Sequence, residues 1–224
     1  MPLHSNPRNP VATPRYAIVG RCGSAGARPI NHIGILRDQA QVAPRQIVAV
    51  DDWQPPLGNP GWVRADAIGW IDLDDEARYG LESWLEEKKV LQPLPPTTWT
   101  PWDQYILSPA FDEVLDEHSA TDRIKRHRYS CAGFVERAYA EGARTPLVVD
   151  PPLLPLVDLD MLRGVWGLAF RAAGKTEAVL PSLGLSGPGP WRVLLPGYLL
   201  AACRSAAPRP YQPRVADASC GEMA

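Results

Sequence analysis

The sequence predicts a single domain of the α+β class, and three observations lead to this prediction. The chain has 224 residues, which is enough for one domain with a sizeable core but cramped for two. Residues 16–71 contain short apolar or alternating runs bounded by glycine and proline, a pattern typical of strands. A later segment that starts at Ser130 instead spaces its apolar residues as a helix does.

The overall composition argues against several kinds of partner. Hydrophobic residues make up 45% of the chain and charged residues 21%, as in an ordinary globular protein. The net charge of -2 provides no positive field for nucleic acid or anionic lipid, so we expect neither partner. No apolar run is long enough to span a bilayer, and residues 1–15 lack the apolar core of a signal peptide. These features predict a cytoplasmic protein, although export by a dedicated secretion system would leave no such signal.

The cysteines form no recognisable metal or disulfide pattern. All four are far apart, with no close-spaced pair for a metal, and they are too few for a disulfide scaffold of this size. We therefore predict no metal and no cofactor. Cys22 is expected to be buried, while Cys203 and Cys220 receive no role.

The first third of the chain is expected to supply most of the sheet. An apolar run at 16–20 ends in glycine and predicts a first buried strand. Residues 30–37 predict a second strand, and residues 46–50 predict a third that pairs with the second as a hairpin. One or two further strands are expected within 61–71.

Helices and irregular connections are expected in the rest of the chain. The 25 prolines and 18 glycines predict long loops, and a connection over 91–109 contains Trp99 and Trp102. That connection forms either a wall over the site or aromatic packing over the sheet edge. Apolar spacing predicts helices at 72–89, 111–118, 131–141, 159–173 and 196–204.

The two ends of the chain are expected to be flexible. Residues 1–15 and 206–224 are rich in proline and show little periodicity. This leaves a single domain over 16–205, with a C-terminal extension from about residue 150.

Cys131 is the candidate nucleophile because it falls at the start of an expected helix. Ser130 is a natural N-cap, which places Cys131 at the first helical position. The unpaired amides and the positive end of the helix dipole favour the thiolate there, and the thiolate is the form that attacks carbonyl carbon. The alternative is that Cys131 is only a small buried hydrophobic residue.

His32 is the candidate base for this thiol. On the strand 30–37 it shares a face with Gly34, which leaves room above that face. Imidazole can take the thiol proton and later give a proton to the leaving group. His127 is an alternative base. A zinc site made of His118, His127 and Cys131 is also conceivable, but the spacing does not suit a tetrahedral site.

The two segments together resemble a known superfamily. His32-Ile33-Gly34-Ile35-Leu36 is followed about a hundred residues later by Ser130-Cys131-Ala132-Gly133-Phe134-Val135-Glu136-Arg137-Ala138-Tyr139. These motifs, in this order, are similar to those of the circularly permuted branch of the NlpC-type papain-like hydrolases and acyltransferases. The resemblance implies a papain-like core in which an antiparallel sheet carries the histidine and packs on the cysteine helix.

The resemblance also implies a third site residue, a polar side chain on the strand after the histidine. A simple hairpin offset places it near 46–49, where the strand centre offers only apolar residues. We therefore move the role to Asp51, with Gln46 or Asp52 as substitutes.

The sequence thus predicts either a thiol hydrolase, which would be an amidase or peptidase, or an acyltransferase. The substrate would be a peptide, an amide or an acyl ester, and the reaction would pass through an acyl-Cys131 intermediate. Trp99, Trp102, Tyr129 and Ser130 are the candidate substrate-binding residues. The alternative is an inactive member of the fold that binds a protein or ligand through its tryptophan-rich loops.

Overall fold

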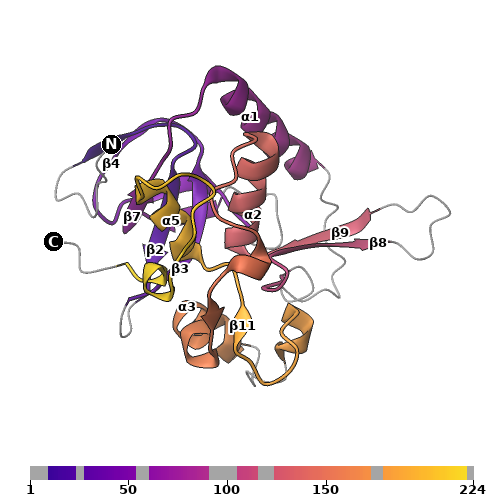
Figure 1. Cartoon of the computed structure of the whole chain (residues 1–224). Coiled ribbons are helices and arrows are strands. Elements are labelled where there is room, and N and C mark those ends of the chain that lie inside the picture. Colours follow the sequence, from indigo (N-terminus) through magenta and orange to yellow (C-terminus); the bar gives the residue numbers. More distant parts are fainter. Residues whose placement is uncertain are drawn as a thin grey trace.

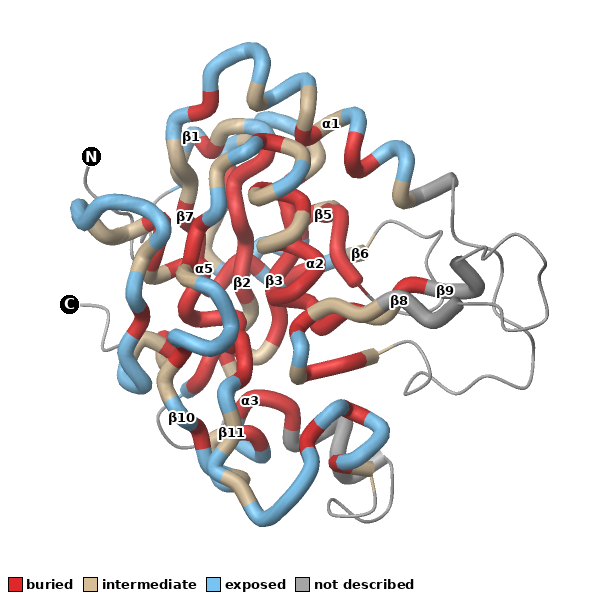
Figure 2. Tube along the Cα trace, turned by 45° about the vertical axis from the view of Figure 1, so that its right-hand side comes forward, coloured by how far each residue is buried: buried red, intermediate tan, exposed pale blue. Residues whose placement is uncertain are grey.

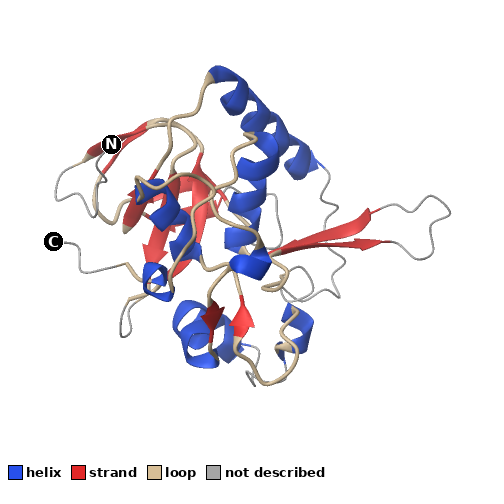
Figure 3. Cartoon of the chain, viewed as in Figure 1, coloured by secondary structure: helices blue, strands red, loops and turns tan. Residues whose placement is uncertain are grey.

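The central feature of the protein is an antiparallel five-stranded sheet with the strand order β6-β5-β3-β2-β7 (Figures 1 and 3). The computed structural model describes residues 10–23, 28–53, 61–90, 105–115, 124–172 and 179–220. The five strands are β2 (Ile18–Cys22), β3 (Ile30–Leu36), β5 (Ile47–Asp51), β6 (Gly61–Arg64) and β7 (Ala67–Gly69). The predicted strands are therefore confirmed, and β3 and β5 are antiparallel neighbours as expected.

Alternation along the strands divides the interior into two cores. Successive side chains of a strand point to opposite faces. Ile33 and Ile35 of β3 belong to the larger core, which also contains the buried side chains of the helices. Leu36 of β3 and Val50 of β5 belong to a smaller core on the other side of the backbone. Figure 2 shows both strands as buried elements at the centre of the molecule.

The helices cover the face of the sheet that carries the larger core. Figure 1 shows α2 and α5 beside β2 and β3, and α1 packs on the turn that continues α2. Cys131–Arg137 forms α2, and a π-helical turn, Ala138–Gly142, continues it, so the helix predicted over 131–141 is confirmed. The other helices are α1 (Asp75–Val90), α3 (Leu159–Ala172) and α5 (Pro196–Arg204). No helix among the described residues is both long and apolar enough to cross a membrane.

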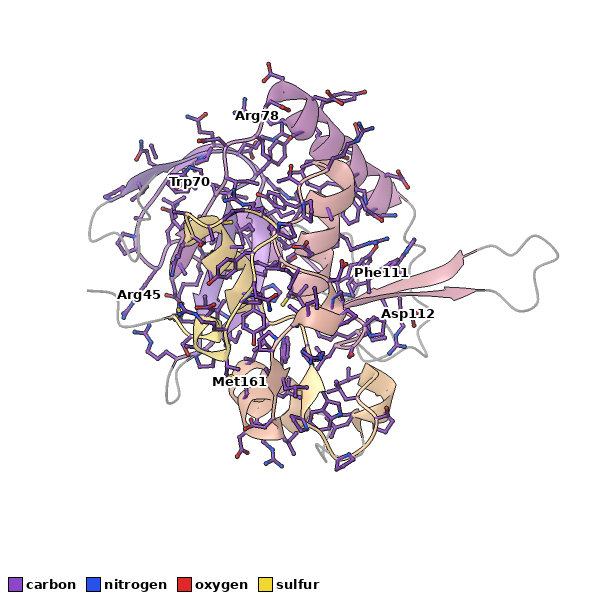
Figure 4. All side chains as sticks on the ribbon, viewed as in Figure 1. Arg45, Trp70, Arg78, Phe111, Asp112 and Met161 are labelled. Atoms are coloured by element: carbon purple, nitrogen blue, oxygen red, sulfur yellow. A yellow bond between two sulfur atoms is a disulfide. The ribbon has the colours of Figure 1, made fainter. Side chains whose placement is uncertain are left out.

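A two-stranded hairpin projects from the body of the molecule beside α2 (Figure 1). Its strands are β8 (Phe111–Leu115) and β9 (Ile124–Tyr129), and Phe111 lies opposite Tyr129. Figure 4 shows Phe111 and Asp112 at the base of this hairpin, near the start of α2. The prediction of a helix over 111–118 is therefore wrong for 111–115. Residues 116–118 lie outside the described residues.

Both chain ends are more ordered in their described parts than expected. The short strand β1 (Val11–Thr13) pairs with β4 (Ala40–Val42) in the segment expected to be a flexible tail. At the other end, a disulfide joins Cys220 to Cys22 of β2. The remaining short elements are 3-10 turns at Pro151–Leu153, Pro181–Leu183 and Val215–Ala218 and the strand pair β10 (Leu156–Val157) and β11 (Trp191–Arg192).

Candidate active site

The structure places Cys131 at the first position of α2, as the sequence predicted. The N-cap is Ser130, whose Oγ accepts a hydrogen bond of 2.9 Å from the amide of Gly133. This bond satisfies one of the amides that a helix start leaves unpaired. Cys131 itself is fully buried, so the cap fixes the thiol in the interior rather than at the surface.

Gly133 allows the start of α2 to lie against the end of the loop before β8. A β-carbon at this position would lie 1.9 Å from the carbonyl oxygen of Ala110. The same carbonyl accepts a hydrogen bond of 3.3 Å from the amide of Ser130. The glycine is therefore required by close backbone packing next to Cys131.

Replacing Gly133 with alanine should destabilise the protein by about 1–3 kcal/mol, because the added methyl group overlaps backbone that cannot easily move. Chemical denaturation would measure this loss. The control is Gly164→Ala on the exposed side of α3, where a β-carbon meets only a Pro29 ring carbon at 3.6 Å. The control should be neutral or slightly stabilising, since alanine favours helix over glycine. Equal stability of the two variants would contradict this account of Gly133.

His32 of β3 contacts both the candidate nucleophile and a carboxylate. Its Nε2 lies 2.6 Å from Oδ2 of Asp52, and the ring also forms a hydrogen bond with the side chain of Cys131. The side chains of His32 and Asp52 are only 9% and 2% exposed, so water competes little with either contact. Three segments that are distant in sequence thus bring together a carboxylate, an imidazole and a thiol.

The carboxylate at His32 belongs to Asp52, which the sequence had offered only as a substitute for Asp51. In the sheet, Asp51 lies opposite Ile35, so the two share a face. His32 is three residues before Ile35 and so, like Asp52, lies on the other side of the strand from Ile35 and Asp51. It contacts Cys131 at the start of β3, where the backbone of Ile33 also interacts with the thiol. Asp51 instead forms an ion pair of 2.7 Å with Arg37. The structure therefore gives the contact with His32 to Asp52 and not to Asp51 or Gln46.

Two glycines make room for the Asp52 side chain. A β-carbon on Gly34 would lie 3.0 Å from Cβ of Asp52, and one on Gly61 would lie 1.8 Å from its Oδ1. Gly34 was expected to leave space above the face of His32. In the folded protein that space is occupied by Asp52 and by Val50. The absence of a side chain at Gly34 therefore allows the carboxylate to reach His32.

The local electrostatics favour an ionised pair. Burial disfavours the imidazolium of His32, but its hydrogen bonds to Asp52 and Cys131 outweigh this and raise its pKa to about 9. Burial also disfavours the thiolate of Cys131, but the hydrogen bond and charge of His32, together with Tyr105, lower the pKa of the thiol. The two ions stabilise each other, and in addition Asp52 raises the pKa of His32 while Tyr105 lowers that of Cys131.

Tyr105 is a further polar group at the thiol that the sequence did not reveal. Its hydroxyl accepts a hydrogen bond of 3.1 Å from the backbone amide of Cys131 and also interacts with the thiol. Burial, followed by the nearby Cys131 charge, raises the pKa of Tyr105 well above its usual value, so this hydroxyl keeps its proton. Arg128 holds the backbone of Tyr105 through a hydrogen bond of 3.0 Å to its carbonyl oxygen. Tyr105 precedes Cys131 by 26 residues, and no spacing rule links the two.

Two of the candidate substrate-binding residues have internal roles in the structure. Tyr129 is 1% exposed, and its ring centroid lies 4.6 Å from that of Trp53 and 4.9 Å from that of Phe111. Ser130 is fully buried and acts as the helix cap. Neither side chain faces solvent, so both lie in the packed interior together with Cys131. Trp99 and Trp102 lie outside the described residues.

The second candidate base, His127, lies in the hairpin rather than at the thiol. Its ring stacks at 6.1 Å from that of Tyr129 and 6.3 Å from that of Phe111. His118, the third member of the alternative zinc site, lies outside the described residues. In the part of the chain that the structure describes, no three histidine, cysteine or acidic side chains come together as a metal site would require.

The arrangement has the parts that thiol chemistry on a carbonyl requires: a polarised thiol, a base in contact with it, a carboxylate behind the base, and hydrogen-bond donors nearby. Comparisons of the chain with protein-family models, with curated proteins and with solved structures found no match. The inference of function therefore depends on the geometry of this site.

Proposed function

We propose that the protein is a thiol hydrolase or acyltransferase that acts on an amide or ester through a covalent acyl-Cys131 intermediate. His32 is the general base and acid, and Asp52 orients it. The single observation that carries the proposal is the chain of contacts from Asp52 through His32 to Cys131, in a buried site that favours the thiolate.

Before the reaction starts, the thiol proton of Cys131 has moved to His32, so that Cys131 is a thiolate and His32 is an imidazolium. Because Nε2 of His32 is engaged by Asp52, we assign the contact with sulfur to Nδ1. The thiolate attacks the substrate carbonyl carbon, and the carbon–sulfur bond forms as the carbonyl electrons move to oxygen. When the tetrahedral intermediate collapses, the leaving amine or alcohol takes the proton from His32 and leaves an acyl thioester.

The second half of the reaction releases the acyl group. Water, or another nucleophile in the case of an acyltransferase, gives a proton to His32 and attacks the thioester carbonyl. Collapse expels Cys131 as a thiolate, and the imidazolium is restored beside it. The amide of Cys131 and the hydroxyl of Tyr105 are the donors for the oxyanion, since a carbonyl oxygen can replace Tyr105 as acceptor of that amide and accept from the hydroxyl as well.

The order of the motifs adds support from resemblance. The histidine strand precedes the cysteine helix, as in the permuted NlpC-type papain-like proteins, and β3 lies in an antiparallel sheet against α2. We propose that the α+β core is of this type. An inactive member of the fold would need no residue that orients the histidine, so the carboxylate of Asp52 at His32 argues against that alternative.

The test is alkylation of the folded protein with iodoacetamide between pH 5 and pH 9, followed by intact mass and peptide mapping. The rate of Cys131 alkylation should rise with pH, and the midpoint of this rise should lie well below the pKa of about 8.5 of a free thiol. His32→Ala should lose this low-pH reactivity, and Cys131→Ser should lose the adduct. A hydrolase assay on ester and amide libraries is justified once this result is in hand.

Cys203 provides an internal control in the same sample. Like Cys131 it is a buried thiol outside the disulfide. Burial raises the pKa of Cys203 to about 12, and the nearby Arg209 and Arg204 offset this only in part. Cys203 is the more exposed of the two residues, at 7% against 0%, so a higher reactivity of Cys131 at low pH reports ionisation rather than access. If Cys131 responds to pH as Cys203 does, and His32→Ala changes nothing, the proposed chemistry is overturned.

A further inference from the structure

The Cys22–Cys220 disulfide lies next to the histidine in the sheet. Cys22 is the last residue of β2, and its neighbour Arg21 pairs with His32 across the β2–β3 ladder. The register shifts between Arg21 and Cys22, so that Cys22 lies opposite Ile30. The ladder is therefore irregular at the position from which His32 must reach Cys131, and a bulge of this kind weakens strand pairing.

The C-terminal segment closes over this irregular end of the ladder. The amide of Cys220 donates a hydrogen bond of 3.0 Å to the carbonyl of Arg28, and Ser219 forms an antiparallel bridge with Pro29. Arg28 and Pro29 lead directly into β3. The disulfide joins this segment to β2, and the sequence separation of the two cysteines is 198. The C-terminal segment is thus joined to β2 by a covalent bond and to the residues that lead into β3 by backbone contacts.

The closing segment is itself anchored on the body of the protein. The 3-10 turn Val215–Ala218 packs on α5, where a β-carbon at Gly197 would lie 2.5 Å from the carbonyl oxygen of Asp217. Ala218 is fully buried, and Cys220 is 2% exposed. Cys22 also donates its amide to Oδ2 of Asp66 at 3.0 Å. The bond therefore connects two packed regions, and both of them contact β3 or the residues that lead into it, at the end that carries His32.

We propose that the Cys22–Cys220 disulfide is a clamp that holds His32 in position for Cys131, so that the site is fully assembled only in the oxidised chain. This inference rests on the proposed function of the His32–Cys131 pair. The bond forms when the two thiols lose two electrons and two protons to a disulfide oxidant, which is thereby reduced to two thiols. Disulfides persist in oxidising compartments, so the clamp argues for a site of action outside the reducing cytosol, in contrast to the location expected from the sequence.

The test compares the pH midpoint of Cys131 alkylation with and without the clamp. The oxidised wild-type protein is the reference, and the Cys22→Ser/Cys220→Ser double variant lacks the bond. A second clamp-free sample is wild-type protein reduced in its folded state by a dithiol, which is oxidised to its cyclic disulfide and then removed. This sample keeps the test valid if the double variant does not fold. The stability control is Leu81→Ala in α1, a buried residue remote from the clamp.

The proposal predicts that the midpoint rises by about one pH unit or more without the bond, which is about a tenfold loss of reactivity at low pH. Leu81→Ala should lower thermal stability and leave the midpoint unchanged. An unchanged low midpoint in both clamp-free samples, or two free thiols at Cys22 and Cys220 in protein purified without reductant, overturns the clamp but leaves the proposed function intact. An ordinary midpoint in oxidised wild type that His32→Ala does not alter overturns the proposed function itself.

Discussion

Asparagine in place of Asp52 should abolish most of the low-pH reactivity of Cys131. The amide oxygen can still accept a hydrogen bond from Nε2 of His32, so the geometry is retained, but the negative charge is lost. In a buried site the imidazolium then lacks its main partner, the pKa of His32 falls, and the thiolate of Cys131 loses the cation that stabilises it. Each unit by which the midpoint rises lowers alkylation at pH 6 about tenfold, and we expect one to two units.

The matched control for this variant is the adjacent residue. Asp51→Asn removes the same charge one position earlier, but from the face that carries the ion pair with Arg37. This control should leave the alkylation midpoint of Cys131 within a few tenths of a pH unit of wild type. If the two asparagine variants behave alike, or if only Asp51→Asn impairs the thiol, then Asp52 does not have the orienting role. Peptide mapping of the adduct and a thermal unfolding curve would accompany both measurements.

The elements next to the thiol could be predicted because their signals are local. Serine followed by cysteine before an apolar helical face predicted the cap at Ser130 and the first helical position at Cys131, and both are observed. The alternation in β3 predicted which side chains share a face, and Ile33 and Ile35 indeed lie in one core. These features depend on a few neighbouring residues and on the period of a helix or strand.

The hairpin shows how a local pattern can mislead. Phe111, Val114 and Leu115 recur at helical spacing, yet this segment is a strand because Phe111 pairs with Tyr129 of β9. In a segment this short, the two periods can scarcely be distinguished, and pairing with a distant strand decides the outcome. The sequence shows no sign of that pairing.

Asp51 was preferred to Asp52 for a related reason. A simple hairpin offset pointed to 46–49, and the role passed to Asp51 because the strand centre there is apolar. In the structure β4 lies between β3 and β5 and pairs with β1. The resulting register places Asp51 opposite Ile35, and a shift of one residue moves a side chain to the other face. The contacts of Tyr105 with Cys131 and of Cys22 with Cys220 join positions far apart in sequence, and only the folded chain reveals them.

Glu136, five residues after Cys131, should make the stability of the protein depend on pH. Burial raises the pKa of this carboxyl from its ordinary 4.5 to about 7, despite a hydrogen bond of 3.1 Å from the amide of Leu147, and nearby Asp150 adds to the rise. The backbone amides of Leu147 and Val148 both interact with the carboxyl and lower its pKa, but burial outweighs them. Because the folded pKa lies above the unfolded one, the fold favours the neutral acid. The stabilisation is present below pH 4.5 and is lost as the pH rises through 7.

Glu136→Gln should therefore stabilise the protein at pH 8 and have little effect at pH 4.5. Glutamine keeps an acceptor for the amide of Leu147 and carries no charge, so the gain at pH 8 approaches about 3 kcal/mol, the value that a shift of this size implies. Urea denaturation at both pH values would measure the difference. The exposed Glu76→Gln is the control, and its effect should be small at both pH values because its side chain is 84% exposed. If the gain in stability at pH 8 is no larger than that at pH 4.5, the pKa of Glu136 is not raised in the folded protein, and the buried carboxylate is stabilised by another group.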